Sequence, residues 1–222
     1  MSVSSNLERL HADLPAKVTL VAVSKFHPKE AILEAYEAGQ RIFGESRVQE
    51  LVEKQALLPT DIEWHFIGHL QTNKVKQVVP IVSLIHSVDS LKLLQEIDKE
   101  AARIDRVVPC LLQLHIAQET QKFGFSLDEC RELVSDGTLI ELKHIRVRGV
   151  MGMATLTDDT TLIESEFTTL RRFFDEVKAH DFPSDPLFNV VSMGMSDDYP
   201  LAVQAGSTMI RVGSLLFGDR QY

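Results

Sequence analysis

Lys25 is the residue whose type and position first point to chemistry. It follows the apolar run Val18 to Ser24 and precedes the short loop Phe26-His27-Pro28. A run so continuously apolar is typical of a parallel strand that is covered on both faces. A lysine at the end of such a strand is either a solvated residue that begins a loop or a nucleophile that forms a Schiff base. Position alone favours the solvated lysine.

A second group of polar residues lies near the end of the sequence. Ser196 follows a glycine-containing loop and has the residue type of a helix N-cap, so the free amides of that helical turn would bind an anion. Gly213 lets a ligand approach the backbone, and Ser214 offers a hydroxyl. Arg211 ends the strand before them. The alternatives are an ordinary helix cap at Ser196 and a paired structural arginine at Arg211.

Short apolar runs alternate with helical patterns, and this alternation predicts the elements that would position these residues. The expected strands are Val18 to Ser24, Arg41 to Gly44, Trp64 to Ile67, Leu84 to Ser87, Pro109 to His115, Val147 to Met151, Phe188 to Val191 and Met209 to Val212. The expected helices are Lys29 to Ala38, Val48 to Leu57, Thr72 to Val78, Ser90 to Ile104, Leu127 to Ser135, Leu162 to His180 and Tyr199 to Ala205.

Eight strands alternating with helices favour a closed (β/α)₈ TIM barrel, and a doubly wound open sheet is the alternative. An extra helix near Ser5 to Ala12 is expected across the bottom of the barrel. The sequence has no stretch typical of an interdomain linker, so residues 1–222 are expected to form a single domain. A barrel closes its last strand on its first, so the loops after strands seven and eight, a recurrent phosphate site, would face Lys25.

Composition excludes several classes of function. The net charge of −9 argues against nucleic-acid binding, which requires a clustered basic face. The N-terminus has no signal-peptide pattern, and no apolar stretch is long enough to span a bilayer, so we expect a cytoplasmic protein without a membrane partner. Cys110 and Cys130 are far apart in the sequence, which gives no support to a metal or dithiol site.

An amine that faces a phosphate site implies a phosphorylated aldehyde, and pyridoxal 5′-phosphate (PLP) has both groups. The sequence resembles the pyridoxal phosphate homeostasis protein family, whose members are single-domain relatives of the alanine racemase barrel. Its most specific block is Trp64-His-Phe-Ile-Gly-His-Leu-Gln-Thr-Asn-Lys74. The other matching segments are Val21 to Lys25, Phe43 to Glu50, Lys122 to Gly124, Arg148 to Met151, Ser192 to Asp197 and Gly206 to Gly213.

The resemblance implies a role for each matching residue. Lys25 would form the internal aldimine with PLP, and the phosphate would be bound by Ser196, Gly213 and Ser214. Arg211 would face the pyridine nitrogen, where a guanidinium, which has no acceptor, disfavours protonation of the ring.

Two further residues complete the expected cofactor site. Met151 is carried over from the Arg148 to Met151 match. Ser46 stands where many family members have an asparagine, so an amide contact to the cofactor would become a hydroxyl contact.

The resemblance implies a PLP carrier that serves vitamin B6 homeostasis, with PLP-dependent apo-enzymes as candidate recipients and a monomer as the expected state. The alternative is a PLP-dependent amino-acid racemase, which needs a second acid/base group, normally a tyrosine from another domain. Tyr36, Tyr199 and Tyr222 are the three tyrosines, and none is expected to supply it. A phosphosugar enzyme with a structural Lys25 is disfavoured by the match along the chain.

Overall fold

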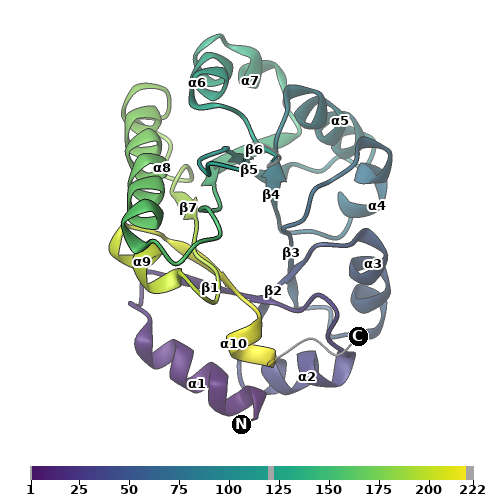
Figure 1. The fold of residues 1–222 in the computed structure, drawn as a ribbon. Coiled ribbons are helices and arrows are strands. Elements are labelled where there is room, and N and C mark those ends of the chain that lie inside the picture. The colour runs from purple at the N-terminus through teal and green to yellow at the C-terminus, as the bar shows by residue number, and fades with distance from the viewer. Residues whose placement is uncertain (1, 120–122, 219–222) are drawn as a thin grey trace.

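Eight parallel strands close into one barrel, as a ring of strands surrounded by helices in Figure 1. The structure is a computed structural model that describes residues 2–119 and 123–218; Lys122 and Tyr222 lie outside the described residues. The strands are β1 (Thr19–Val23), β2 (Ile42–Glu45), β3 (Glu63–Phe66), β4 (Leu84–Val88), β5 (Val108–Gln113), β6 (Ile145–Met151), β7 (Val190–Ser192) and β8 (Met209–Val212). The expected barrel is confirmed, and β1 pairs with both β2 and β8, which excludes the open sheet.

Helices cover the outside of this ring. They are α1 (Val3–Asp13), α2 (Lys29–Glu37), α3 (Val48–Leu57), η1 (Thr72–Lys74), α4 (Val75–Val78), α5 (Leu91–Ala102), α6 (Leu127–Ser135), α7 (Thr138–Glu141), α8 (Thr160–His180), α9 (Tyr199–Gln204) and α10 (Ser214–Phe217). Ser90 caps α5, and Ser126 and Glu129 form a capping box on α6. The sequence analysis missed α7 and α10, because four residues are too short to show helical periodicity. None of the described helices is long and apolar enough to cross a bilayer.

Side chains along each strand point alternately into and out of the barrel, and this divides the hydrophobic core into two parts. A small cluster fills the barrel interior and consists of Val21, Leu84, Leu111, Met151, Val190 and Met209. A larger cluster packs the outward-facing strand residues, such as Leu20 and Ala22, against the helices. Successive strand residues point to opposite faces, so β1 directs Val21 and Val23 inward and, two residues later, Lys25 into the carboxyl end of the barrel.

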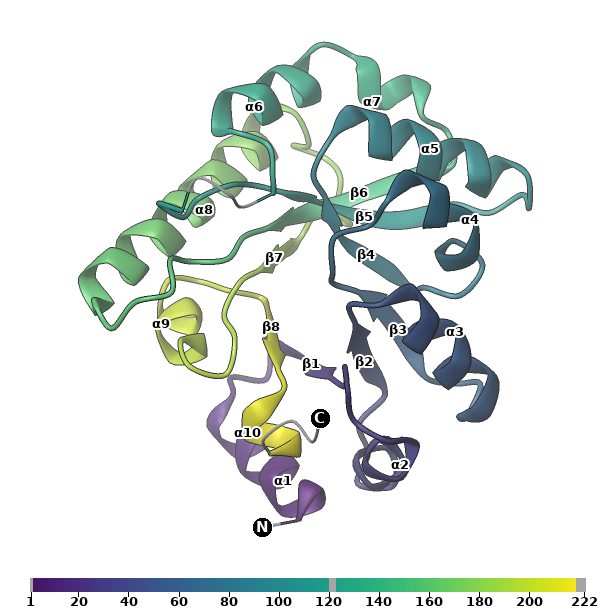
Figure 2. The same cartoon turned by 45° about the vertical axis from the view of Figure 1, so that its right-hand side comes forward.

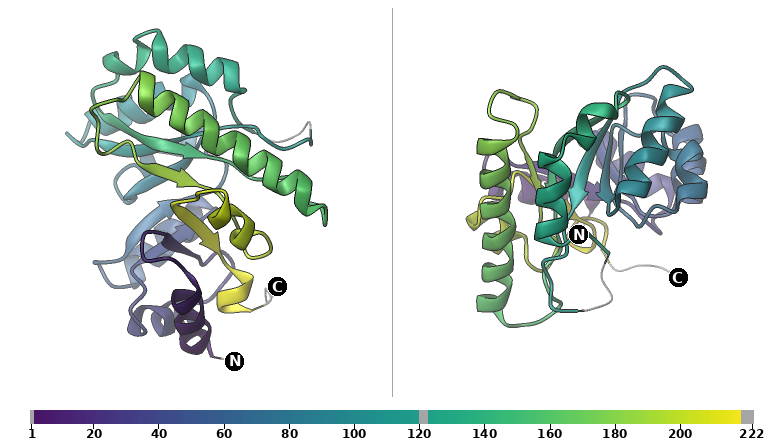
Figure 3. Two further views of the ribbon diagram at one scale, coloured as in Figure 1. Left: turned by 90° about the vertical axis from the view of Figure 1, so that its left-hand side faces the viewer. Right: turned by 90° about the horizontal axis from the view of Figure 1, so that it is seen from above.

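Helix α1 lies on the flank of the barrel and not across its bottom, where the sequence analysis expected it. It packs beside α2 and α10, as Figures 2 and 3 show. The side-chain amide of Asn6 donates to the Leu216 carbonyl oxygen at 3.0 Å, and Leu7 and Leu10 are buried. Because α10 has only four residues, the flank of β8 and β1 is left for α1 to cover.

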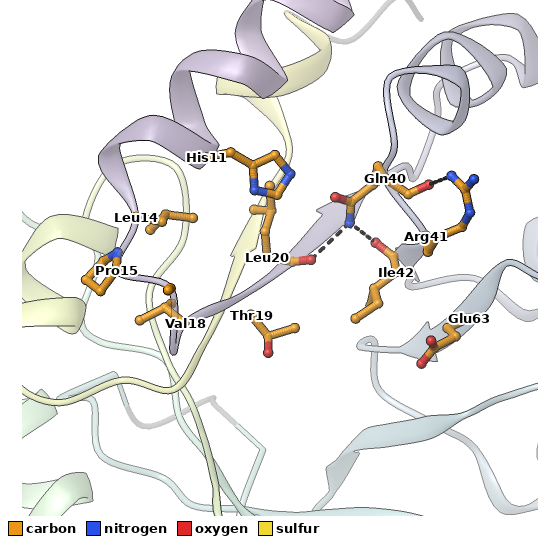
Figure 4. Close-up of a pocket in the computed structure, with 11 residues that line it drawn as sticks. His11, Leu14, Pro15, Val18, Thr19, Leu20, Gln40, Arg41, Ile42 and Glu63 are labelled. Carbon is orange, nitrogen blue, oxygen red and sulfur yellow. Dashed lines mark hydrogen bonds between the residues drawn. The ribbon is translucent and has the colours of Figure 1, made fainter.

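The amino end of the barrel contains a cavity of about 350 Å³ beside α1 and the starts of β1 and β2 (Figure 4). Its central polar group is the Gln40 side-chain amide, which donates to the carbonyl oxygens of Leu20 at 3.0 Å and Ile42 at 2.6 Å. Arg41 donates to the Gln40 carbonyl oxygen at 3.0 Å. These polar groups satisfy backbone atoms of neighbouring strands, which is a structural role.

Candidate functional site

A cavity of about 500 Å³ opens at the carboxyl end of the barrel. It brings together six of the predicted site residues, which follow or end the first two and the last two strands: Lys25, Ser46, Ser196, Arg211, Gly213 and Ser214. Met151 is not among the lining residues, because it packs inside the barrel with Val21 and Met209. Met153, two residues later, lines the cavity instead.

The pairing of the first and last strands explains why Lys25 and Arg211 share this cavity. Val21 is the register partner of Arg211 across the β1–β8 pair. Lys25 therefore lies above the level of Arg211, and Gly213 lies near Val23. A Cβ atom at Gly213 would come within 3.2 Å of the Val23 carbonyl oxygen, so the glycine keeps this part of the cavity open.

The backbone that carries Lys25 is held from both sides by residues of β2 and α3. Phe26, directly after Lys25, has a φ of 66°, and its N–H donates to Glu50 Oε2 at 2.8 Å. Directly before Lys25, the carbonyl oxygen of Ser24 accepts from Lys54 Nζ at 2.8 Å. Lys54 also donates to Glu50 at 3.0 Å and to Glu45 at 2.7 Å. The ammonium group of Lys54 thus connects the residue before Lys25 with the carboxylate that binds the residue after it.

Burial and hydrogen bonding act differently on the pKa values of the Glu45 and Glu50 carboxyl groups. Glu45 is fully buried, which raises its pKa, while Lys54 and the Ser24 hydroxyl oppose that shift. Partial burial also acts to raise the pKa of Glu50, but its bonds to the Phe26 N–H and to Lys54 outweigh burial and hold the pKa below its ordinary value. Glu50 is therefore the ionised partner that accepts from the strained turn at neutral pH.

Ser196 and Gly213 join the two loops that were predicted to bind phosphate. The Gly213 N–H donates to Ser196 Oγ at 3.2 Å. The expectation that Ser196 caps the following helix is wrong: the N-cap of α9 is Asp198, whose carboxylate accepts from the Met195 N–H at 2.6 Å. The carboxylate of Asp198 takes the local amide, so the Ser196 hydroxyl is left to bridge to the loop after β8.

Arg211 lies at the bottom of the cavity with only 4% of its surface exposed. Its Nη1 donates to Ser192 Oγ at 2.6 Å and its Nη2 to the Gly152 carbonyl oxygen at 3.1 Å. Burial lowers the pKa of Arg211 to about 10 and the carboxylate of Asp198 opposes this shift, so the guanidinium stays charged at neutral pH. Both of these acceptors are neutral oxygens, which leaves the cation available to a polar ligand.

Sequence reasoning did not select several residues that line the cavity. His69 stacks on Phe123 with ring centroids 3.9 Å apart, and its Nδ1 lies 2.9 Å from Asp89. Gln113 donates to the Phe123 carbonyl oxygen at 2.8 Å. A polar residue at the end of an apolar strand was a usable signal for Gln113. No such signal exists for Phe123, which comes from a loop.

Comparison with known proteins places these features in a family. Residues 2–221 match the family described as alanine racemase, N-terminal domain. The sequence is 38% identical over 208 residues to the pyridoxal phosphate homeostasis protein of Aquifex aeolicus, covering 91% of this chain and 87% of the relative. It is 37% identical over 215 residues to the protein of the same name from Escherichia coli K12, covering 94% and 88%.

Solved structures also show similarity to this family and to its barrel fold. PipY of Synechococcus elongatus PCC7942, determined with PLP bound, is 39% identical, with a TM-score of 0.88 over 98% of this chain and 100% of that one. An alanine racemase of Clostridium difficile 630 shares the fold with a TM-score of 0.79 at 14% identity, and the match covers 57% of its chain. The similarity to the racemase is therefore limited to its barrel.

Proposed function

We propose, from the premise that this chain belongs to the pyridoxal phosphate homeostasis protein family and to the wider alanine racemase N-terminal domain family, that it binds PLP and holds it for storage or delivery in vitamin B6 homeostasis. The observation that carries the proposal is the joint lining of one cavity of about 500 Å³ by an amine, a buried guanidinium and a serine–glycine loop pair. We propose further that residues 1–222 form one PLP-binding domain.

The residues of the cavity fit the aldehyde, the phosphate and the pyridine nitrogen of PLP. Lys25 offers an amine to the aldehyde. Ser196 and Ser214 offer hydroxyl groups to the phosphate, and Gly213 lets the phosphate approach the backbone. The buried cation of Arg211 has neutral oxygens as its bonded acceptors and suits the lone pair of an unprotonated pyridine nitrogen. Ser46 lines the same cavity, and Met153 takes the place for which the sequence indicated Met151.

Covalent attachment through Lys25 is the finer part of the proposal. Lys25 would hold the cofactor by a C=N bond between its unprotonated Nζ and the aldehyde carbon, with the aldehyde oxygen and the two Nζ hydrogens released as water. PLP supplies an electron sink when bound, and a charged Arg211 at the pyridine nitrogen weakens that sink by disfavouring ring protonation. Such a site favours retention of the cofactor over carbanion chemistry.

A carrier role also agrees with the positions of the described tyrosines. Tyr36 donates its hydroxyl to Asp61 Oδ1 at 2.7 Å on the outer side of α2, and Tyr199 does not line the cavity. Racemisation needs an acid/base group on the side of the ring opposite to the lysine. His27, His69 and Asp197 do line the cavity and are titratable, so amino-acid racemisation is the alternative function. No exchange of the α-hydrogen of alanine in deuterated water above a free-PLP control would eliminate it.

Addition of PLP to the purified protein tests the proposal directly. We expect a visible absorption band that borohydride removes, and a stable reduced adduct located on Lys25 by peptide mass spectrometry. Lys25→Ala should abolish the band and the adduct. Absence of any band in the wild type would overturn PLP binding, whereas an intact adduct in Lys25→Ala would show that another amine is used. We propose a cytoplasmic monomer whose recipients are PLP-dependent apo-enzymes, with no nucleic-acid partner.

A further inference from the structure

A chain of buried polar side chains leads from the bottom of the cavity into the barrel. Arg211 Nη1 bonds to Ser192 Oγ at 2.6 Å, Ser192 Oγ lies 3.0 Å from His86 Nδ1, and His86 Nε2 lies 3.0 Å from His65 Nδ1. The four residues come from β8, β7, β4 and β3 and are at most 4% exposed. Polar groups at this depth are costly unless each is hydrogen-bonded, so their arrangement needs an explanation.

The donor-only chemistry of Arg211 determines which group donates and which accepts in each of the three hydrogen bonds. A guanidinium is a donor only, so Ser192 Oγ must accept from Arg211. Among the described residues the other partner of this hydroxyl is His86, so its hydrogen is satisfied only if it is donated to His86 Nδ1. The proton of a neutral His86 is then on Nε2 and is donated to His65 Nδ1. His65 in turn carries its proton on Nε2.

Both histidines have to be neutral for this order to hold. Burial lowers the pKa of His65 to about 3. Burial also lowers the pKa of His86 well below its ordinary value; a proton on the neighbouring His65 would lower it further, and the charge of Arg211 acts in the same direction. Each imidazole therefore has one donor and one acceptor nitrogen at neutral pH. All hydrogen bonds of the chain point away from Arg211.

On the basis of the proposed function, we propose that His86, supported by His65, is a positioning residue that fixes the guanidinium of Arg211 toward the pyridine nitrogen of PLP through Ser192. With one lone pair accepting from Arg211 and its hydrogen donated to His86, the Ser192 hydroxyl cannot rotate to donate to the cavity. The Gly152 carbonyl oxygen holds the second nitrogen of Arg211. The plane of the guanidinium is thus set by two acceptors, one of which depends on His86.

The tautomers can be measured in the protein without PLP. We expect long-range ¹H–¹⁵N correlation spectra at pH 7 to show His86 and His65 as neutral rings protonated on Nε2. A proton on Nδ1 of His86, or a doubly protonated ring, would overturn the proposed order of donors. This measurement does not depend on PLP binding, so it separates the present proposal from the proposed function.

Variants of His86 test the effect on the cofactor. In His86→Leu the Ser192 hydroxyl loses its acceptor, and we expect PLP to dissociate about tenfold faster, the scale of one lost hydrogen bond, with a larger protonated fraction of the ring. His86→Asn keeps an acceptor near the position of Nδ1 and should restore most of the wild-type spectrum. Ser207→Ala is the matched control, because it removes another buried hydroxyl that is not part of the Arg211–Ser192–His86–His65 hydrogen bonds. The Ser207 hydroxyl lies within hydrogen-bond distance of the carbonyl oxygens of Val191, Met193 and Met209.

Two results would overturn the role of His86. One is a folded His86→Leu protein with the wild-type spectrum and dissociation rate. The other is a Ser207→Ala protein that loses PLP as fast as His86→Leu, because the effect would then be a general consequence of core damage. If His86→Leu does not fold, the tautomers in the wild type and the spectrum of His86→Asn decide the question. A wild-type protein that forms no PLP band would contradict the proposed function. The tautomer measurement would still test the order of donors and acceptors.

Discussion

Glu50 accepts a hydrogen bond from the backbone N–H of Phe26 at 2.8 Å and thereby ties helix α3 to the residue that follows Lys25. Phe26 has a φ of 66°, a left-handed conformation that costs a non-glycine residue about 1–2 kcal/mol. The bond helps to offset this strain directly beside the amine. The position of the Lys25 amine thus depends on residues that lie outside the cavity.

Removal of the Glu50 carboxylate should loosen this turn. Glu50→Ala leaves the Phe26 N–H without its carboxylate acceptor and removes one of the three acceptors of Lys54. We expect a loss of about 1–3 kcal/mol in the free energy of unfolding. We also expect slower formation of the Lys25 adduct, measured by the rise of the visible band after PLP is added. Glu53→Ala changes an exposed glutamate on the same helix and should leave both unchanged. Equal behaviour of the two variants would refute the role given to Glu50.

The strain at Phe26 predicts an unusual order of stability for two small substitutions. Glycine adopts a positive φ without a Cβ clash, so Phe26→Gly should be more stable than Phe26→Ala by about 1 kcal/mol. Both lose the contact between the Phe26 ring and the Arg47 guanidinium, which lies 4.3 Å from the ring centroid. Urea denaturation of the two variants gives the difference directly. If alanine is the more stable, the turn is not strained.

The buried histidines predict how stability depends on pH. In the unfolded chain, His65 and His86 bind a proton near pH 6.5, but in the folded protein both pKa values are depressed, that of His65 to about 3. Between these pKa values the unfolded state binds more protons, so stability falls as pH falls. The expected loss from pH 7 to pH 5 is about 2 kcal/mol for His65, and the depressed pKa of His86 adds to it.

Urea denaturation at the two pH values measures this loss. His86→Asn removes one of the two groups and should make the pH-dependent loss clearly smaller. His11→Asn removes an exposed histidine and serves as the control. A His86→Asn protein with the same pH dependence as the wild type would show that His86 does not titrate as its burial requires.

The charge of Arg211 should control the protonation of bound PLP. Arg211→Glu replaces a donor-only cation by a carboxylate, which favours a protonated pyridine nitrogen. We expect a larger protonated fraction in the absorption spectrum and in its pH titration. Arg172→Glu makes the same charge change at an exposed position of α8 and is the control for net charge. An Arg211→Glu spectrum identical to the wild type would exclude direct contact with the ring.

Local patterns were sufficient to predict the barrel. Each strand begins and ends within two residues of its expected bounds, because continuous apolar runs between helical patterns are produced by parallel strands covered on both faces. Six of the predicted residues, Lys25, Ser46, Ser196, Arg211, Gly213 and Ser214, line one cavity because strand ends in such a barrel share one face, and their contact with PLP stays a prediction. Met151 lies one inward-facing level below the residues that line the cavity, and the sequence does not show how far above a strand the cavity begins.

The amino-acid sequence by itself determined the order of elements and the strand ends at which the candidate site lies, since these follow from residue types that are near one another along the chain. It favoured a closed barrel over an open sheet, and the pairing of β1 with β8 decided between them. The tertiary structure decided which distant residues meet. Only the closure and register of the barrel bring Glu50 and Lys54 to the Lys25 turn, and only they align Arg211, Ser192, His86 and His65 inside it. These contacts depend on strand register and helix packing, which leave no periodic signal in the sequence.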